Sequence, residues 1–302
     1  MFHTVTLGRK VSKEDFKQRV PALRQGLLLQ QARLKQHGDF PVIVLFAGVD
    51  GAGKAQTVNL LNEWMDPRLL VTRAYSAPSD EESERPPFWR FWRDLPRNGR
   101  IGMFLSAWYS APLLDHVRDG DDTVLNRRLD EIVEMERMLV ADGALILKFW
   151  MHLDRDAQAS RFERMAADPL QAWRVTEEGR RNLALYDSFV ASAETIVHRT
   201  STGEAPWHLV EGTDSRYRTL HVAGILRDAV ERRLNHLEAL NGDAPRATDT
   251  LQPDELSAPE IESRTLFDTL DLSATLEQKE YKQRLKAGQE RLGRLHRAAR
   301  AR

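Results

Sequence analysis

The chain has 302 residues, 41% of them apolar and 29% charged, with a formal net charge of −1 at pH 7. This composition is typical of a globular protein with a sizeable core, and its balanced charge excludes a general attraction to nucleic acid or membranes. The absence of cysteine excludes disulfides and thiolate chemistry. With no signal peptide and no run approaching the roughly 20 apolar residues of a membrane span, we expect a cytoplasmic protein without membrane or nucleic-acid partners.

Helical periodicities and short apolar runs alternate along the first 240 residues. In chain order, we expect helix 11–37, strand 42–46, helix 57–65, strand 69–72, strand 100–104, helix 123–141, strand 144–150, helices 155–167 and 177–200, strand 207–210 and helix 217–237. Strand 42–46 is apolar throughout, as in strands that helices cover on both faces. The alternation predicts an α/β protein with a doubly wound parallel sheet.

Residues 48–55 read GVDGAGKA, which satisfies the phosphate-loop pattern G-x-x-x-x-G-K. Glycines let backbone N–H groups turn toward phosphate oxygens, and the following helix adds its positive N-terminal end. An apolar strand precedes the pattern and helical spacing follows it, which is the context that the pattern requires. The residues expected to bind phosphate are Gly48, Gly51, Ala52, Gly53, Lys54 and Ala55. The alternative is an ordinary glycine turn between a strand and a helix.

Ala55 is the unusual residue of this loop. Most phosphate loops have Ser or Thr after the lysine, and its hydroxyl holds Mg²⁺. Because alanine cannot do this, a metal ion would need Asp50 or another carboxylate.

The segment FWRFWR at 88–93 supports two interpretations. Its aromatic rings could stack on a nucleotide base, or they could form the apolar face of a short helix. We favour packing, because aromatic side chains bury large areas in cores. Arg93 and Arg97 remain candidate ligands of a nucleotide or phosphate.

The composition changes near residue 241. Residues 241–275 are rich in Pro, Asp, Glu, Ser and Thr, which predicts a linker, and a basic helix is expected over 276–302. The pentapeptide YKQRL at 281–285 parallels FKQRV at 16–20. We therefore expect one complete domain over 1–240, a linker, and a helix that resembles the start of a second, missing domain.

Five segments together resemble the type-2 polyphosphate kinase family over about residues 11–237. They are FAGVDGAGK, PPFWRFWRDLPRNGRIGMF, SAWY, RFERMAADPLQAWR and APWHLV. The resemblance implies a P-loop kinase fold with a basic helical lid, and the helix near 276 resembles the start of the second domain in tandem polyphosphate:AMP phosphotransferases. The phosphate loop alone would also suit a thymidylate-kinase-like protein.

The resemblance also implies roles for matching residues. Lys54 and Asp50 match the catalytic lysine and aspartate of the loop, and Asp50 would lie near the metal, Mg²⁺ or Mn²⁺. Arg161, Arg164 and Arg174 match basic positions that would grip polyphosphate, to which arginine can donate paired hydrogen bonds. Taken alone, Arg161 and Arg164 would be interpreted as a solvated helix face.

Two departures from the family pattern bear on turnover. Leu105 and Ser106 stand where competent members usually have an acid or amide and an arginine. We expect phosphoryl transfer from inorganic polyphosphate to AMP, ADP or another nucleotide, and a homo-oligomer is a possible assembly. The alternatives are a non-catalytic phosphate-binding or dimerising domain that supports an active second domain, and an ATP-dependent nucleoside-monophosphate kinase.

Overall fold

The computed structural model describes residue 2, residues 5–240 and residues 275–300. The chain divides into two units, Met1–Asp243 and Ala244–Arg302. The described part of the second unit is one helix, α11 (Gln278–Arg300), whose basic side chains alternate with exposed leucines. Most of the predicted linker lies outside the described residues. No helix in the described ranges is both long and apolar enough to cross a membrane.

The first unit is built on a five-stranded sheet. Its strands are β1 (Val42–Gly48), β2 (Leu70–Ala74), β3 (Ile101–Leu105), β4 (Leu145–His152) and β5 (Trp207–Glu211). All pairings are parallel, in the order β2-β3-β1-β4-β5. Residues 42–46 are at most 1% exposed, so this central strand is buried on both faces as its sequence predicts. The predicted parallel α/β sheet is confirmed.

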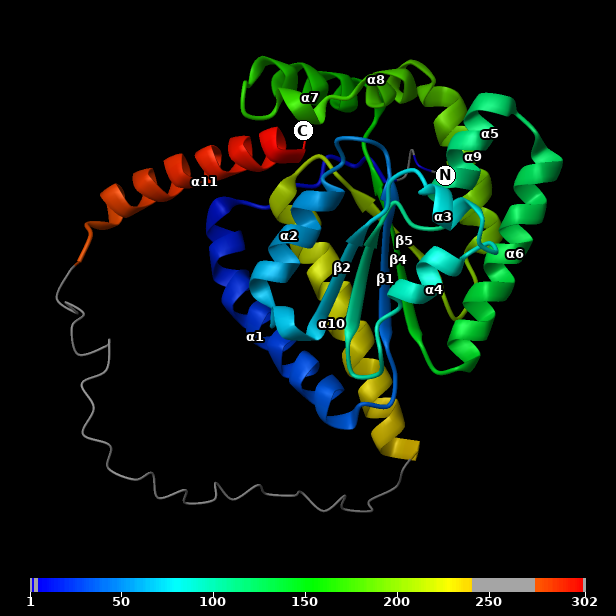
Figure 1. Cartoon of the computed structure of the whole chain (residues 1–302). Helices are drawn as coiled ribbons and strands as arrows, with labels where there is room; N and C mark the ends of the chain where they lie inside the picture. The colour runs from blue at the N-terminus through cyan, green and yellow to red at the C-terminus, as the bar shows by residue number, and fades with distance from the viewer. Residues whose placement is uncertain (1, 3–4, 241–274, 301–302) are drawn as a thin grey trace. The chain divides into compact units, whose positions relative to one another are not determined.

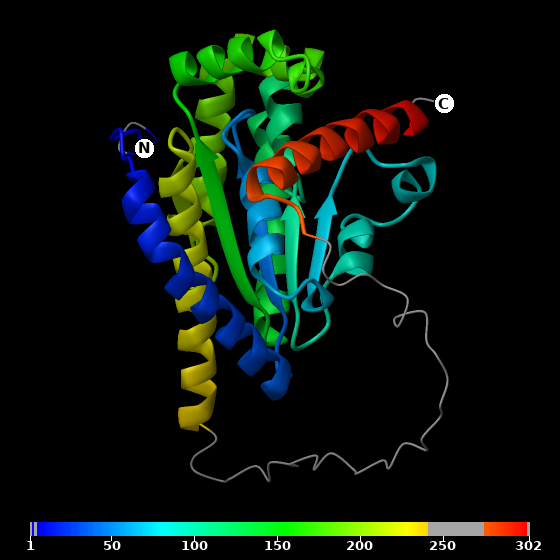
Figure 2. The same cartoon turned by 90° about the vertical axis from the view of Figure 1, so that its left-hand side faces the viewer.

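Helices cover both faces of this sheet. Helices α1, α2 and α10 lie on one side, and α5, α6 and α9 lie on the other (Figures 1 and 2). The helices of the first unit are α1 (Lys13–His37), α2 (Lys54–Trp64), η2 (Pro67–Leu69), α3 (Asp80–Ser83), α4 (Trp89–Asp94), α5 (Ser110–Asp119), α6 (Asp122–Ala141), α7 (Arg155–Ala167), η3 (Ala172–Arg174), α8 (Glu177–Ala184), α9 (Tyr186–Thr200) and α10 (Ser215–Leu240).

One helix that the sequence predicts as continuous is interrupted in the structure. The expected helix 177–200 is two helices, because Leu185 leaves helical geometry with φ −97° and ψ 23°. Helix α9 buries an apolar face against the core, whereas α8 buries only Gly179. Tertiary packing therefore turns the chain at Leu185, and α8 joins α7 and η3 in a lid beyond the carboxyl ends of the strands (Figure 1).

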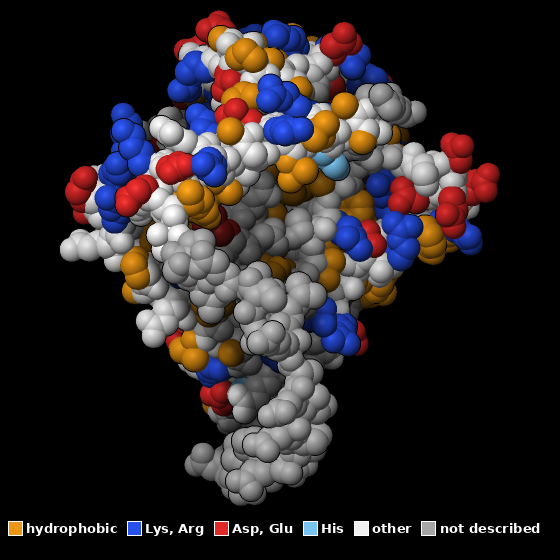
Figure 3. Space-filling model, turned by 60° about the vertical axis from the view of Figure 1, so that its left-hand side comes forward, with side chains coloured by type: hydrophobic (Ala, Val, Ile, Leu, Met, Phe, Trp, Pro, Cys, Tyr) orange, Lys and Arg blue, Asp and Glu red, His pale blue; other side chains and the backbone are white. Residues whose placement is uncertain are grey.

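The surface carries both signs of charge. On the face shown in Figure 3, Lys and Arg side chains are interspersed with Asp and Glu. This matches the net charge of −1 and means that an anion site must come from local clustering of basic residues.

Candidate functional site

The loop between β1 and α2 depends on its glycines. Gly48, Gly51 and Gly53 have φ values of 125°, 80° and 92°, which other residues rarely adopt. A Cβ atom on Gly48 would stand 2.0 Å from the carbonyl oxygen of Met151 in β4. The pattern seen in the sequence therefore produces a tightly curled loop at the carboxyl end of the central strand.

The loop leaves backbone N–H groups available for a ligand. The amides of Val49 and Ala52 donate to Met151 O and Val49 O within the protein. The amides of Gly53, Lys54 and Ala55 have no acceptor among the described residues, because they precede the first hydrogen-bonded turn of α2. They give the loop the free donors and the positive helix end that suit an anion.

Lys54 and Asp50 lie together inside the loop. Lys54 Nζ donates to Gly48 O at 2.6 Å and to Val49 O at 3.0 Å, and Asp50 Oδ1 is 3.8 Å away. Burial lowers the pKa of Lys54, and the charge of Asp50 opposes that shift. The other oxygen of Asp50 accepts a 3.1 Å hydrogen bond from Asn182 in α8. The sequence did not single out Asn182, which ties the loop to the lid.

Arg218 supports the loop from beneath, and no sequence motif identified it. Its side chain is 1% exposed and donates to Thr57 Oγ1, Gly212 O and Gln56 Oε1 at 3.1, 2.8 and 3.0 Å. Burial, and then the charge of Arg161, lower the pKa of Arg218 to about 10. A buried guanidinium facing only neutral acceptors adds positive potential under the loop.

Arg161 connects the lid to the loop. Its Nη1 donates to Gly51 O at 2.6 Å and Gly212 O at 3.3 Å. Burial lowers the pKa of Arg161, and the neighbouring charges of Arg164 and Arg174 lower it further. The three predicted lid arginines therefore do come together, and Arg161 also has a structural contact.

A first cavity of about 580 Å³, here called the lid cavity, lies between the loop and the lid. Its basic lining residues are Lys54, Arg161, Arg164 and Arg174, and Asp50 is its acidic one. This excess of cations suits a polyanion, because the net positive charge of the lining attracts negative charge.

A second cavity of about 520 Å³, here called the strand-end cavity, opens on the other side of the loop. Its walls come from β1 and β4, from the segments after β2 and β3, and from α4, α5, α8 and α9. Asp50, Lys54, Thr176 and Gly179 line both cavities. Two ligands could therefore meet at the Asp50–Lys54 pair.

Arg93 and Arg97, the arginines proposed from the sequence as nucleotide or phosphate ligands, line neither cavity. Arg93 forms ion pairs with Glu82 and Asp94 and lines neither cavity. Arg97 is exposed two residues before Gly99. The amide of Gly99 donates to Phe40 O, just before β1, so Arg97 lies at the opposite end of the sheet from the loop. Arg90 is the arginine of the aromatic segment that lines the strand-end cavity.

The aromatic side chains of the same segment are mainly packed. The Phe91 ring lies edge-on to Tyr75 and Trp108, at centroid distances of 4.8 and 5.5 Å. Trp89 is covered by the guanidinium groups of Arg85 and Arg93. Trp92 remains 44% exposed, outside the strand-end cavity.

Two of the three residues that depart from the family pattern, Ser106 and Ala55, line the cavities. Ser106 follows β3 with φ 53°, a strained conformation for a residue other than glycine, and lines the strand-end cavity. Leu105 ends β3 opposite Phe46, and Ala55 lines the lid cavity. None of the three can supply a charged group.

The site offers one carboxylate, that of Asp50, as a ligand for a metal ion. Among the described residues, no group of three or more His, Cys, Asp or Glu side chains could hold one. Asp50 is 42% exposed and lies between the cavities. One carboxylate fits Mg²⁺ when phosphate oxygens and waters complete its octahedron, but it does not form a cage of protein ligands.

Comparisons with known proteins agree on one family. A sequence model described as polyphosphate kinase 2 matches residues 10–238. A polyphosphate:AMP phosphotransferase of Pseudomonas aeruginosa is 40% identical over 303 residues, covering 100% of this chain and 60% of that protein. One of Pseudomonas syringae pv. tomato is 38% identical, covering 97% of this chain and 57% of the relative. The chain thus spans less than two thirds of the length of these relatives.

A solved structure gives the same result for the fold. The crystal structure described as polyphosphate kinase 2 from Arthrobacter aurescens is 27% identical and superposes with a TM-score of 0.72. The match covers 80% of this chain and 85% of that one.

Proposed function

This chain belongs to the polyphosphate kinase 2 family, and from that premise we propose that its first unit transfers a terminal phosphoryl group from inorganic polyphosphate to AMP or ADP. In this proposal polyphosphate occupies the lid cavity and the nucleotide occupies the strand-end cavity. One observation carries the assignment: both cavities are lined by Asp50 and Lys54, so donor and acceptor would meet there. The relatives named polyphosphate:AMP phosphotransferase support this substrate pair. The cytoplasmic location expected from the sequence is part of the same proposal.

The protein's contribution would be positioning and charge neutralisation. Phosphoryl transfer spreads charge over the phosphate oxygens, so fixed cations and N–H groups lower its barrier. Lys54 and the amides of residues 53–55 would hold the transferred group, and the lid arginines would hold the rest of the chain. Mg²⁺ or Mn²⁺, held by Asp50 and phosphate oxygens, would supply further charge neutralisation.

Ala55, Leu105 and Ser106 favour a second candidate function. Without the loop hydroxyl and the two polar groups after β3, the unit could bind polyphosphate as a non-catalytic domain that supports an active one. Binding and turnover therefore need separate measurements.

The experiment uses the full chain with Mg²⁺. Calorimetry measures tripolyphosphate binding, and luminescence follows ATP formed from ADP and polyphosphate. Lys54→Met should abolish both signals, whereas the control Lys10→Met, at an exposed position, should preserve them. Unchanged turnover in Lys54→Met would overturn the proposed site. Tight binding without turnover would support the second candidate, and turnover with ATP and AMP alone would indicate an ATP-dependent nucleoside-monophosphate kinase.

A further inference from the structure

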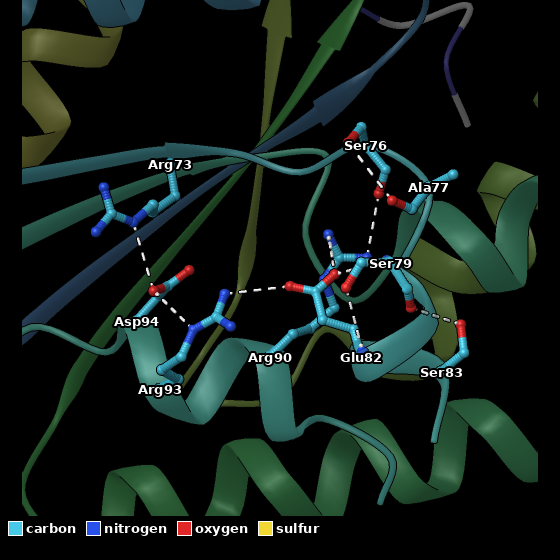
Figure 4. A network of polar contacts seen from close by, with 9 residues as sticks. All are labelled: Arg73, Ser76, Ala77, Ser79, Glu82, Ser83, Arg90, Arg93 and Asp94. Carbon is cyan, nitrogen blue, oxygen red and sulfur yellow. Dashed lines mark hydrogen bonds and ion pairs between the residues drawn. The ribbon is translucent and has the colours of Figure 1, made fainter. Parts of the chain in front are cut away.

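The connection between β2 and β3 carries a chain of alternating charges. Figure 4 shows the order Arg73, Asp94, Arg93, Glu82 and Arg90. Its nitrogen–oxygen distances are 3.5, 3.5, 3.1 and 3.4 Å along that order. Three cations and two anions leave one unneutralised positive charge. The chain ends at Arg90, in the wall of the strand-end cavity.

Glu82 is the central residue of this network. Its carboxylate accepts from the amide of Ser79 at 3.1 Å and completes a capping box at the start of α3. The same carboxylate pairs with Arg90 and Arg93, and its side chain is only 13% exposed. The hydrogen bond of the capping box holds the Glu82 carboxylate in place, and this carboxylate in turn orients the guanidinium of Arg90.

Arg90 retains unused hydrogen-bonding capacity. Its Nη1 donates to Ser76 O at 3.1 Å, and its guanidinium lies over the rings of Tyr75 and Phe91. Its Nε is buried and has no acceptor among the described residues. The 3.4 Å contact from Nη2 to Glu82 is longer than a strong charge-assisted hydrogen bond. The described residues therefore do not use the full donor capacity of the edge formed by Nε and Nη2.

The other cations of the cavity have other partners or another role. Arg118 pairs with Asp115 and Asp119, each at 2.9 Å, and the proposed function assigns Lys54 to the transferred phosphoryl group. A phosphate group matches the paired N–H donors of a guanidinium edge.

We propose that Arg90 binds the phosphate of the acceptor nucleotide and that Glu82 is the positioning residue that holds Arg90 for this contact. The inference rests on the proposed function, in which the strand-end cavity takes the nucleotide. It assigns to Arg90 the nucleotide contact that the sequence suggested for Arg93 or Arg97.

Calorimetry on the full chain tests the proposal with three ligands: AMP, adenosine and tripolyphosphate. Arg90→Lys keeps the charge but loses the paired donors, so AMP should bind about tenfold more weakly. Glu82→Gln keeps a capping side chain but loses the ion pairs, and should weaken AMP binding about threefold to tenfold. Affinities for adenosine and tripolyphosphate should change less than twofold in both variants.

A matched control and a double variant distinguish positioning from general structure. Glu81→Gln removes a neighbouring carboxylate whose ion pair with Arg85 is exposed, and should leave AMP binding unchanged. In the Arg90→Lys background, Glu82→Gln should have little further effect, because its role acts through Arg90. Equal losses for AMP and adenosine in Glu82→Gln would show a structural role and overturn the positioning role.

The result for the parent chain separates this inference from the proposed function. If it binds neither AMP nor tripolyphosphate, the proposed function fails and the inference fails with it. If it binds both, and Arg90→Lys and Arg90→Gln bind AMP as the parent does, only the inference is overturned.

Discussion

Gly53 lies directly against the guanidinium group of Arg218. A Cβ atom at Gly53 would stand 2.3 Å from Arg218 Cζ, and Gly53 has a φ of 92°. Arg218 cannot move aside freely, because it is buried and donates three hydrogen bonds. The conformation of the phosphate loop therefore depends on a residue far along the chain.

Gly53→Ala should lower the free energy of unfolding by about 2–4 kcal/mol, through a strained φ and displaced hydrogen bonds, and should also weaken tripolyphosphate binding. Urea denaturation and calorimetry provide the measurements. Gly224→Ala is the control, because nothing lies within 4 Å of its added Cβ in α10, and it should stabilise the protein by up to about 1 kcal/mol. If the effects of Gly53→Ala and Arg218→Met are additive, their contact is not the cause.

Substitutions of the lid arginines should differ in their effects on ligand affinity and on stability. Arg174→Gln removes a cation from the lid cavity and should weaken tripolyphosphate binding about tenfold, with little change in stability. Arg161→Gln should lower stability as well, because Arg161 donates to Gly51 O. The loss in Arg174→Gln should shrink at high salt, where charge attraction is screened.

Calorimetry at two salt concentrations tests this difference. Arg180, exposed on α8 and outside the lining of the lid cavity, provides the control substitution Arg180→Gln. An equal loss of affinity in Arg180→Gln would show that the lid acts through its total positive charge. Arg174 would then make no specific contact with the ligand.

The sequence predicted the parts of the site that local patterns determine. The apolar run at 42–46 and the glycines of the loop specify a buried strand and a curled turn by themselves. Arg218 could not be found this way, because it is one of several arginines in a long helix and only folding brings it under the loop. The sequence alone could not distinguish Arg90 from Arg93 for a similar reason. Both lie in one turn of the same helix, and only their contacts in the folded protein show that Arg90 is the one that lines a cavity.

The half-buried His208 in β5 should make stability depend on pH. Burial lowers the pKa of His208, and the charges of His221 and Arg232 lower it further. The unfolded chain, with a histidine pKa of about 6.5, therefore binds a proton at a pH where the folded state does not. Stability should be constant above about pH 7.5 and fall as the pH drops through about 6.5.

Urea denaturation between pH 5 and 8 measures this dependence. His208→Gln should reduce the slope of the curve below about pH 6.5, since glutamine does not titrate, while His221, whose pKa burial also lowers, keeps its own contribution. Stability at pH 8 gives the packing cost of the substitution separately, because His208 also lies against Phe149. An unchanged slope in His208→Gln would show that other groups cause the acid instability.

The buried charge of Lys148 in β4 should stabilise the fold only together with its partner. Lys148 Nζ is 2.6 Å from Glu136 Oε2, and both side chains are at most 3% exposed. The other oxygen of Glu136 accepts from Trp108 Nε1 and from the hydroxyl of Tyr109, which lines the strand-end cavity. Burial lowers the pKa of Lys148, while the charge of Glu136 opposes the shift. The pair therefore fixes the segment after β3 from inside the core.

Lys148→Met should lower the free energy of unfolding by about 3–5 kcal/mol, because it leaves the carboxylate of Glu136 buried without a cation. The double variant Lys148→Met with Glu136→Gln should recover much of this loss, since glutamine is neutral and can still accept from Trp108 and Tyr109. Urea denaturation of the parent, both single variants and the double variant completes the cycle. If the double variant is as unstable as Lys148→Met, the lost packing of the lysine side chain, rather than the unpaired charge, accounts for the effect.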